Sequence, residues 1–206
     1  MAPRSTPFVC LLKEMSMKKI GSSIAGLALA ATAAFAAPVQ ANLVTNGGFE
    51  TGDFSGWAQT GESDFNGVQC AGPGASVYAG NCSAYFGPFS SQGGIAQTID
   101  VGSIGKMWSL SFAFMPDGGM PSSFTVSFGG KTLLSITDPV ASDYMVYQFS
   151  GFTTAENMTL SFDFFDPVGF LSLDEVSVTA VPEPATTALM GAALAGLLVM
   201  RRRKAS

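Results

Sequence analysis

Residues Lys106 to Phe114 read K-M-W-S-L-S-F-A-F, and this stretch decides the fold class. Its large apolar side chains stand at every second position, Trp108, Leu110, Phe112 and Phe114, with serine or alanine between them. An alternation of period two is typical of a β-strand with one buried face. We therefore expect the neighbouring segments to be strands that pair with this one.

Further alternating segments lie on both sides of this strand. Phe124, Val126 and Phe128 repeat the pattern, and Gly129-Gly130 predicts a tight hairpin into the next strand. The other expected strands span residues 84–86, 95–101, 132–136, 144–150, 158–165 and 171–179. Turn residues separate them, and no long helical repeat interrupts them. The pattern favours an all-β fold, an antiparallel β-sandwich of the jelly-roll type.

The N-terminal residues have the order of a secretory signal peptide. Lys18 and Lys19 precede an apolar stretch from Ile20 to Ala37, and the small-residue site Val39-Gln40-Ala41 follows. The alternatives to this interpretation are a transmembrane anchor and a buried helix. A signal peptide predicts export through the Sec machinery and cleavage by signal peptidase.

The predicted signal peptide spans residues 1–41, with its start at Met1 or at Met17. We expect cleavage after Ala41, with Ala36 as a second option. Residues 42–180, called the body below, then remain as one domain of 139 residues that is large enough for a core of its own.

The charge of the body excludes one class of partner. The whole chain has a net charge of −5, but the body holds 13 acids and two bases, Lys106 and Lys131. Nucleic-acid binding needs lysine and arginine to neutralise phosphates, so the body is not expected to bind nucleic acid. Acid-rich loops in an exported protein suit calcium instead, which takes oxygen ligands.

Two cysteines fall in the body, Cys70 and Cys82, and Cys10 lies upstream of the signal-peptide pattern that begins at Lys18. An even pair in an exported chain predicts a disulfide between them. The alternatives are two free thiols or half of a metal site. The sequence has no histidine, and two sulfurs do not complete a zinc site.

The two ends of the body resemble a known fold family. The body opens with N-L-V-T-N-G-G-F-E-T-G-D-F-S-G-W, Asn42 to Trp57, and closes with L-S-L-D-E-V-S-V, Leu171 to Val178. Together with G-N-C-S-A-Y-F-G, Gly80 to Gly87, these stretches resemble the first and last strands of galactose-binding-like jelly rolls, the fold of many carbohydrate-binding modules. The turn Asn46-Gly47-Gly48 is expected to need positive φ angles.

The resemblance implies a structural calcium ion that ties the two ends of the body together. The matching ligands are the carbonyl of Gly48 and the carboxylates of Glu50 and Asp174, and further ligands are expected near residues 81–83, where Cys82 departs from the family pattern. The alternative is that Glu50 and Asp174 are solvated acids at strand ends.

The resemblance also implies glycan contact through aromatic side chains. Trp57, Tyr78, Tyr85 and Tyr144 are the candidates because they carry polar tips and lie at or near loops. Most aromatic residues of a sandwich fill its core, and Trp57 follows a turn, so a core position is the alternative for it.

Catalysis has little support in the sequence. Without histidine, no Ser-His-Asp or Cys-His unit can form. A glycosidase needs two carboxylates, and Asp163 with Asp166 or Asp174 with Glu175 are the available pairs. Neighbouring strand residues point to opposite faces, which argues against Asp174 with Glu175, and Asp166-Pro167 indicates a turn. We expect a non-catalytic protein.

The C-terminal segment, residues 181–206, has three parts in a fixed order. Pro182-Glu183-Pro184 is expected to be extended because proline disfavours the helical conformation in the residue before it. The 16 apolar residues 185–200 would form a helix of about 24 Å, slightly short for a hydrocarbon core of ~30 Å. The basic residues 201–204, including Arg201, Arg202 and Arg203, would stop transfer on the cytoplasmic side.

This order resembles the PEP-CTERM sorting signal of Gram-negative bacteria that make exopolysaccharide. The resemblance implies recognition and processing by the membrane enzyme exosortase. The protein would be anchored transiently in the inner membrane with its C-terminus in the cytoplasm, then released to the cell surface or outside. The alternative is a plain C-terminal anchor that is not cleaved.

The expectation for the whole chain is an exported, non-catalytic surface or extracellular-matrix protein that associates with exopolysaccharide or another glycan. Two alternatives stay open at this point. One is a structural biofilm or envelope protein that binds no glycan, and the other is a glycan-degrading enzyme.

Overall fold

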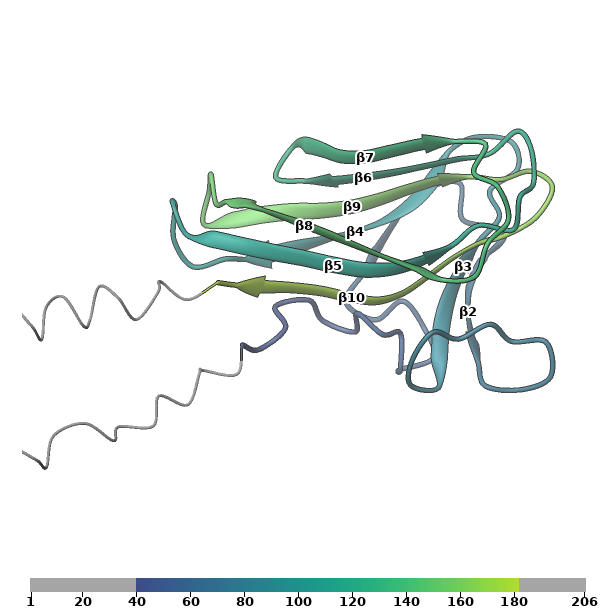
Figure 1. The fold of residues 1–206 in the computed structure, drawn as a ribbon, viewed down its shortest axis with the longest axis horizontal. Coiled ribbons are helices and arrows are strands. Elements are labelled where there is room, and N and C mark those ends of the chain that lie inside the picture. The colour runs from purple at the N-terminus through teal and green to yellow at the C-terminus, as the bar shows by residue number, and fades with distance from the viewer. Residues whose placement is uncertain (1–39, 182–206) are drawn as a thin grey trace, which may run out of the picture. The chain divides into compact units, whose positions relative to one another are not determined.

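A computed structural model describes residues 40–181, which form two antiparallel sheets (Figure 1). Sheet A has the strand order β1 (Ala58–Gly61), β4 (Gly93–Asp100), β9 (Asn157–Phe165), β6 (Ser123–Phe128) and β7 (Lys131–Thr137). Sheet B has the order β2 (Asn66–Cys70), β3 (Cys82–Phe86), β10 (Leu171–Ala180), β5 (Met107–Met115) and β8 (Met145–Phe152). The predicted transmembrane segment and most of the predicted signal peptide lie outside the described residues.

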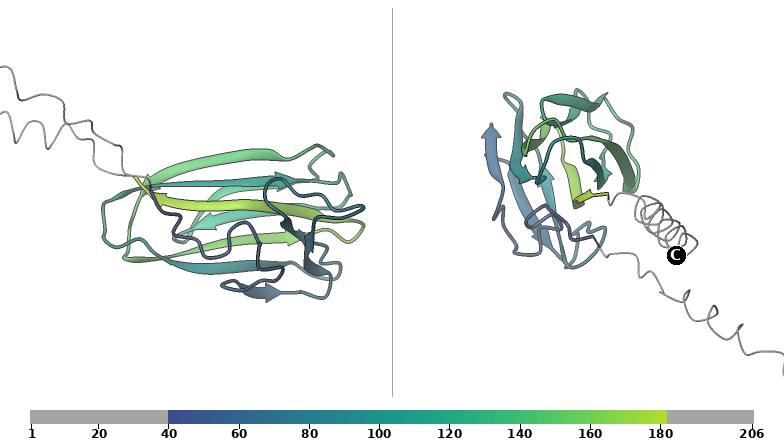
Figure 2. Two further views of the ribbon diagram at one scale, coloured as in Figure 1. Left: turned by 90° about the horizontal axis from the view of Figure 1, so that it is seen from below. Right: turned by 90° about the vertical axis from the view of Figure 1, so that its left-hand side faces the viewer.

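The expected sandwich is confirmed for this part of the chain. In Figure 1, β7, β6 and β9 of sheet A lie above β5 and β10 of sheet B, and Figure 2 shows the strands running side by side. The hairpin between β6 and β7 turns at Gly129 and Gly130, whose φ angles are +59° and +77°. Two consecutive positive φ angles are what a two-residue hairpin of the primed type requires.

Phenylalanine rings from the two sheets stack on one another to form the core. Phe114 of sheet B stacks on Phe124 of sheet A with ring centroids 3.9 Å apart, and Phe86 stacks on Phe164 at 3.8 Å. All four rings are fully buried. Because this core is built from residues of the body itself, the body is a domain with its own hydrophobic core.

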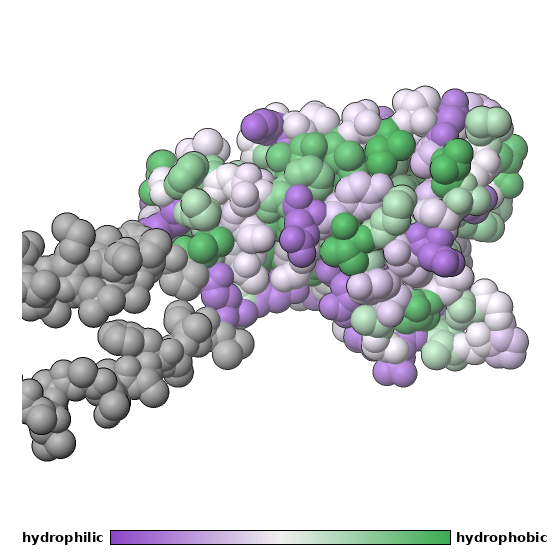
Figure 3. Space-filling model, viewed as in Figure 1, coloured by the Kyte–Doolittle hydropathy of each residue, from purple (hydrophilic) through white to green (hydrophobic). Residues whose placement is uncertain are grey.

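The core is less well covered at one edge of each sheet. Edge strands β7 and β8 carry inward-facing apolar residues that are only partly buried, among them Leu134, Ile136 and Phe149. Figure 3 shows apolar side chains gathered over β6 and β7 on this face.

The expected first strand at residues 42–57 is not present, and the segment is a series of turns. Asn42 takes the place of a strand residue beside β10, since its amide donates to the carbonyl of Val176 and its Oδ1 accepts the N–H of Val178. The φ angles are positive at Asn46 (52°) and Phe49 (56°) instead of at Gly47 and Gly48. Those conformations prevent an extended strand.

The two ends of the described chain lie at the same end of the domain (Figures 1 and 2). Leu43 donates its N–H to the carbonyl of Val178 at 2.8 Å. β10 therefore begins at the opposite end of the domain and runs toward the predicted sorting tail. Among residues 40–181, there is no helix of the length and apolar character needed to cross a membrane.

Candidate functional site

A loop of residues 71–81 lies between β2 and β3 and is fixed at both ends. Cys70 and Cys82 stand opposite each other in the β2–β3 pairing and form a disulfide with an S–S distance of 2.02 Å. The carbonyl oxygen of Ser76, at the centre of the loop, accepts hydrogen bonds from the Ser83 hydroxyl (2.6 Å) and from the amide of Gln69 (3.1 Å). These bonds hold the loop against sheet B.

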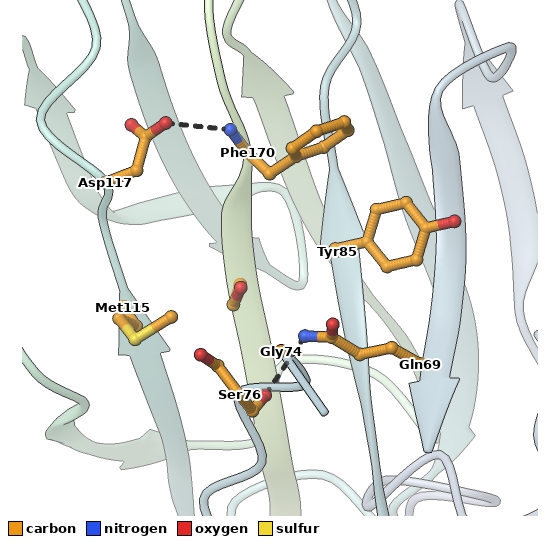
Figure 4. Close-up of a pocket in the computed structure, with 8 residues that line it drawn as sticks. Gln69, Gly74, Ser76, Tyr85, Met115, Asp117 and Phe170 are labelled. Atoms are coloured by element: carbon orange, nitrogen blue, oxygen red, sulfur yellow. Dashed lines mark hydrogen bonds between the residues drawn. The ribbon is translucent and has the colours of Figure 1, made fainter. Parts of the chain in front are cut away.

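A groove of about 570 Å³ opens beside this loop (Figure 4). Its lining combines amide, hydroxyl and carboxylate groups with two aromatic rings and a methionine. We call it the polar groove, and it is lined by Gln69, Gly74, Ser76, Tyr85, Met115, Asp117, Phe170 and Ser172. The strand pairings explain why three of these side chains lie together. Tyr85 lies opposite Ser172, and Ser172 lies opposite Met115, on neighbouring strands of sheet B.

Tyr85 provides an aromatic surface in the groove because the neighbouring strand has a glycine opposite it. Gly67 pairs with Tyr85, and a Cβ at position 67 would lie 2.3 Å from the Tyr85 hydroxyl. The ring therefore extends over β2 where a side chain would otherwise stand. The Tyr85 and Phe170 rings meet edge to face at a centroid distance of 5.3 Å. Figure 4 shows the Tyr85 ring between Phe170 and Gln69.

The other predicted aromatic contacts divide into two groups. Tyr78 and Tyr144 line a recess of about 410 Å³ that shares Ser76 and Met115 with the polar groove. The rings are 5.6 Å apart, and the Tyr144 hydroxyl donates to the Ser76 carbonyl at 3.0 Å. Burial raises the pKa of Tyr144.

Trp57 was a predicted glycan contact, and the structure corrects this prediction. It is 7% exposed, stacks on Phe49 in the core, and donates its indole N–H to the carbonyl of Asn46. A buried indole with its polar group satisfied cannot stack on a ligand, so Trp57 is a core residue.

Glu50 and Asp174, two of the predicted calcium ligands, both bind the end of the 71–81 loop. Glu50 Oε1 accepts the N–H groups of Asn81 (2.8 Å) and Cys82 (3.1 Å), which lower the pKa of this carboxyl group. Asp174 Oδ2 accepts the N–H groups of Tyr78 and Ala79 at 3.0 and 3.1 Å. The two carboxylates therefore tie the loop to the N-terminal turns and to β10.

Asp174 is not a solvated acid. It has no exposed surface, and burial raises its pKa to about 6 even though three backbone N–H groups bind it. Burial disfavours the charged form of a carboxyl group, whereas a nearby cation would favour it. Gly48 lies close to Glu50 and Glu175, since a Cβ there would be 3.6 Å from Glu50 Cγ and 3.2 Å from Glu175 Oε1.

The donor chemistry fits a calcium ion in part. Oxygen ligands are correct for calcium, but Glu50 Oε1 and Asp174 Oδ2 each already accept two N–H groups. Within residues 40–181, no group of three or more Asp, Glu, His or Cys side chains is arranged to hold a metal. Backbone carbonyls, including that of Gly48, and water would have to complete a shell of about six to eight oxygens.

The carboxylate pairs that a glycosidase would need are not placed in the groove. Asp163 lies on β9 in sheet A, and burial raises its pKa. Asp166 is 1% exposed, and its Oδ1 accepts the N–H groups of Val168 and Gly169. Burial raises the pKa of Asp166, and the neighbouring carboxylate of Asp117 raises it further. Asp117 is the single acid among the groove residues of the described chain.

Asp174 and Glu175 do not alternate as ordinary strand neighbours. The pairing of β10 with β5 shifts register between Asp174 and Ser177, and Glu175 has a φ of 49°. This is a β-bulge, which re-aims side chains locally. The expectation of opposite faces on a regular strand was therefore wrong.

The groove residues Gln69, Ser76, Asp117, Phe170 and Ser172 were not predicted from the sequence. A signal existed for Ser172 and Tyr85, which occupy the outward positions of alternating strands. Phe170 carried none, because its place at the groove depends on the β9–β10 loop.

Comparison with solved structures defines the class of the body. It matches TmCBM61, solved in complex with β-1,4-galactotriose, with a TM-score of 0.57 and 18% identity over 68% of this chain and 99% of that chain. It also matches the CBM22-1-GH10 modules of a Clostridium thermocellum xylanase complexed with xylohexaose, with a TM-score of 0.50 and 17% identity, over 69% of this chain and 29% of that chain. The body thus has the β-sandwich fold of carbohydrate-binding modules.

A third match is the enzymatically active domain of tailspike protein 4 from bacteriophage CBA120, with a TM-score of 0.53 and 16% identity over 68% of this chain and 21% of that chain. No curated protein matches the sequence. Residues 180–204 match the PEP-CTERM protein-sorting motif. This is therefore a protein with a PEP-CTERM sorting motif and a carbohydrate-binding-module-like β-sandwich.

Proposed function

We propose that this protein is exported, is sorted through its PEP-CTERM motif, and binds a polysaccharide at or outside the cell surface without catalysis. The observation that carries the proposal is the polar groove. It places the Tyr85 and Phe170 rings beside amide, hydroxyl and carboxylate groups, on a domain with the fold of carbohydrate-binding modules. An aromatic face with a few convergent polar groups is the combination that binds a sugar ring and its hydroxyl groups.

The position of the groove supports this function. The tail begins at the end of β10, whereas the groove includes Phe170, just before that strand, and Ser172, at its start. A strand of ten residues spans about 33 Å. The groove would therefore lie at the end of the domain far from the start of the tail, where a polysaccharide chain could reach it.

A structural role without glycan binding is the second candidate. It would account for the sorting motif and the rigid sandwich, but it gives no reason for a preformed groove with aromatic walls. A degradative enzyme is less well supported, because the groove contains one carboxylate and the described chain contains no histidine.

A glycan array probed with residues 40–181 tests the proposal, and β-1,4-galactan and xylan are natural first probes. Tyr85→Ala is expected to weaken binding about tenfold or more, as loss of a central aromatic contact does. Tyr85→Phe should keep the ring and most of the affinity. Thermal unfolding of both variants serves as the control for folding. Binding that is equal in Tyr85→Ala and the wild type would exclude this groove.

The proposal includes a structural calcium ion at Glu50, Asp174 and the Gly48 carbonyl. Chelation is expected to lower the melting temperature, and Asp174→Asn should remove that response. A ligand of the folded state at a hundredfold excess over Kd stabilises it by about 2.7 kcal/mol. Asp163→Asn, on the other sheet, is the matched control and should still respond. Identical melting curves with calcium and with chelator would remove the ion from the proposal.

A further inference from the structure

Three phenylalanine side chains lie half exposed at one end of the domain. Phe65 and Phe89 are each 50% exposed, and Phe170 is 46% exposed. They line a pocket of about 320 Å³, which we call the phenylalanine pocket. Single exposed apolar residues are normal on a protein surface, but three aromatic rings around one cavity indicate a binding site.

The loops that carry Phe65 and Phe89 are bound to each other. Glu62 Oε2 accepts the N–H groups of Ser90 and Ser91, each at 2.8 Å, so the two loops are joined just beside the two rings. The carbonyl of Phe65 also accepts the N–H of Gly87 at 3.2 Å. The rings meet edge to face at a centroid distance of 5.3 Å. The apolar surface is therefore held in place before any ligand arrives, which lowers the entropic cost of binding.

Phe170 joins this pocket to the polar groove, because it lines both cavities. Its backbone N–H donates to Asp117 Oδ2 at 2.9 Å, and its ring packs against Tyr85. Gly87 leaves room for the Phe170 ring, because a Cβ at Gly87 would lie 2.7 Å from that ring. The polar groove and the phenylalanine pocket therefore adjoin at Phe170.

The lining of the pocket defines the ligand chemistry. Asp166 is the one ionisable residue that lines it in the described chain, and it is 1% exposed with its Oδ1 bound by two backbone N–H groups. The accessible walls are therefore mostly apolar, and the one ionisable side chain among the lining residues is almost fully buried. A volume near the lower end of the range for small-molecule sites, about 300–1,000 Å³, suits one ring-sized unit.

We infer that the phenylalanine pocket is a second subsite of the polysaccharide site and takes the apolar C–H face of a neutral sugar unit further along the same chain. This inference rests on the proposed function of the polar groove. It predicts that the protein prefers long oligosaccharides, because a short one can occupy the groove alone.

Calorimetric titration of residues 40–181 tests the inference with β-1,4-galactotriose, xylotriose and the two corresponding hexaoses. Phe89→Ala is expected to weaken binding of the better hexaose about tenfold and to leave the triose nearly unchanged. Phe65→Ala should behave in the same way, and it replaces Phe89→Ala if that variant does not fold. Phe152→Ala removes a ring that is 63% exposed on β8, outside the pocket, and should bind both lengths like the wild type.

The possible results distinguish a failure of the phenylalanine pocket as a subsite from a failure of the proposed function of the polar groove. If the hexaose binds and Phe89→Ala binds it equally well, the subsite is wrong and the polar groove stands. If neither oligosaccharide series binds the wild type, the proposed function fails for these glycans and the subsite inference is overturned with it. If sedimentation shows that the wild type dimerises and Phe89→Ala does not, the rings form a protein interface, and the inference is also overturned.

Discussion

Replacing Glu183 by alanine is expected to leave the protein exported but retained in the membrane with its full tail. The PEP-CTERM motif at residues 180–204 implies that exosortase processes the tail, and Glu183 is the acid between its two prolines. The apolar segment and the arginines that follow are unchanged in the variant, so anchoring should persist when recognition is lost. Fractionation and the mass of the protein measure the effect, which should be a near-complete loss of the released form.

Replacing Arg201, Arg202 and Arg203 together by serine is the companion variant. It should fail differently, because removing the basic residues weakens the stop on the cytoplasmic side and lets the tail pass through the membrane. A plain anchor would show no processed form in the wild type and no dependence on Glu183. That pair of results would contradict sorting by exosortase.

Gly47→Ala is expected to have the largest effect on folding. A Cβ at this position would lie 2.0 Å from the backbone oxygen of Val176, and the Gly47 carbonyl accepts the Val176 N–H at 2.9 Å. The methyl group would therefore separate the N-terminal turns from β10. We expect the free energy of unfolding in urea to fall by about 3 kcal/mol or more.

Gly72→Ala is the matched control for this variant. Its φ angle is in the ordinary range, and the nearest atom to an added Cβ is the Cys70 oxygen at 3.7 Å. Its free energy of unfolding in urea should differ from that of the wild type by less than about 1 kcal/mol. Equal destabilisation by the two variants would show that the contact between residue 47 and β10 does not hold the ends of the domain together.

The strands that could be predicted from the sequence are those with one buried face. Phe124, Val126 and Phe128 face the core on β6, and their alternation is visible in the sequence because burial selects every second side chain. β1 and β2 were missed for the same reason. They are the edge strands of their sheets, all four residues of β1 are exposed, and no apolar alternation marks them.

The bulge in β10 was visible as a break in period. Leu171 and Leu173 face the core, and the next buried apolar residue is Val176, three positions later instead of two. That shift requires an extra residue in the strand, which the structure provides at Asp174 and Glu175. The alternation could therefore have corrected the expectation about these two acids.

The candidate site was harder to predict than the fold. Tyr85 was identified because it is an aromatic residue with a polar tip near a loop, whereas Gln69 and Ser172 are not aromatic, and the alternation around Ser172 shows only that it faces outward. They meet Tyr85 through the pairing of β2, β3 and β10, and pairing register cannot be read from one strand at a time. The disulfide was predictable because an exported chain with two cysteines in its body leaves one pairing.

The central claim is that the sorted protein binds polysaccharide through the groove beside Tyr85. Its most direct test is co-sedimentation of the processed protein with extracellular polysaccharide that is purified from the organism that produces this protein. The wild type and Tyr85→Phe are expected to sediment with the polysaccharide, and Tyr85→Ala is expected to stay in solution. A folded wild-type protein that stays in solution, or a Tyr85→Ala variant that sediments equally well, would contradict the claim.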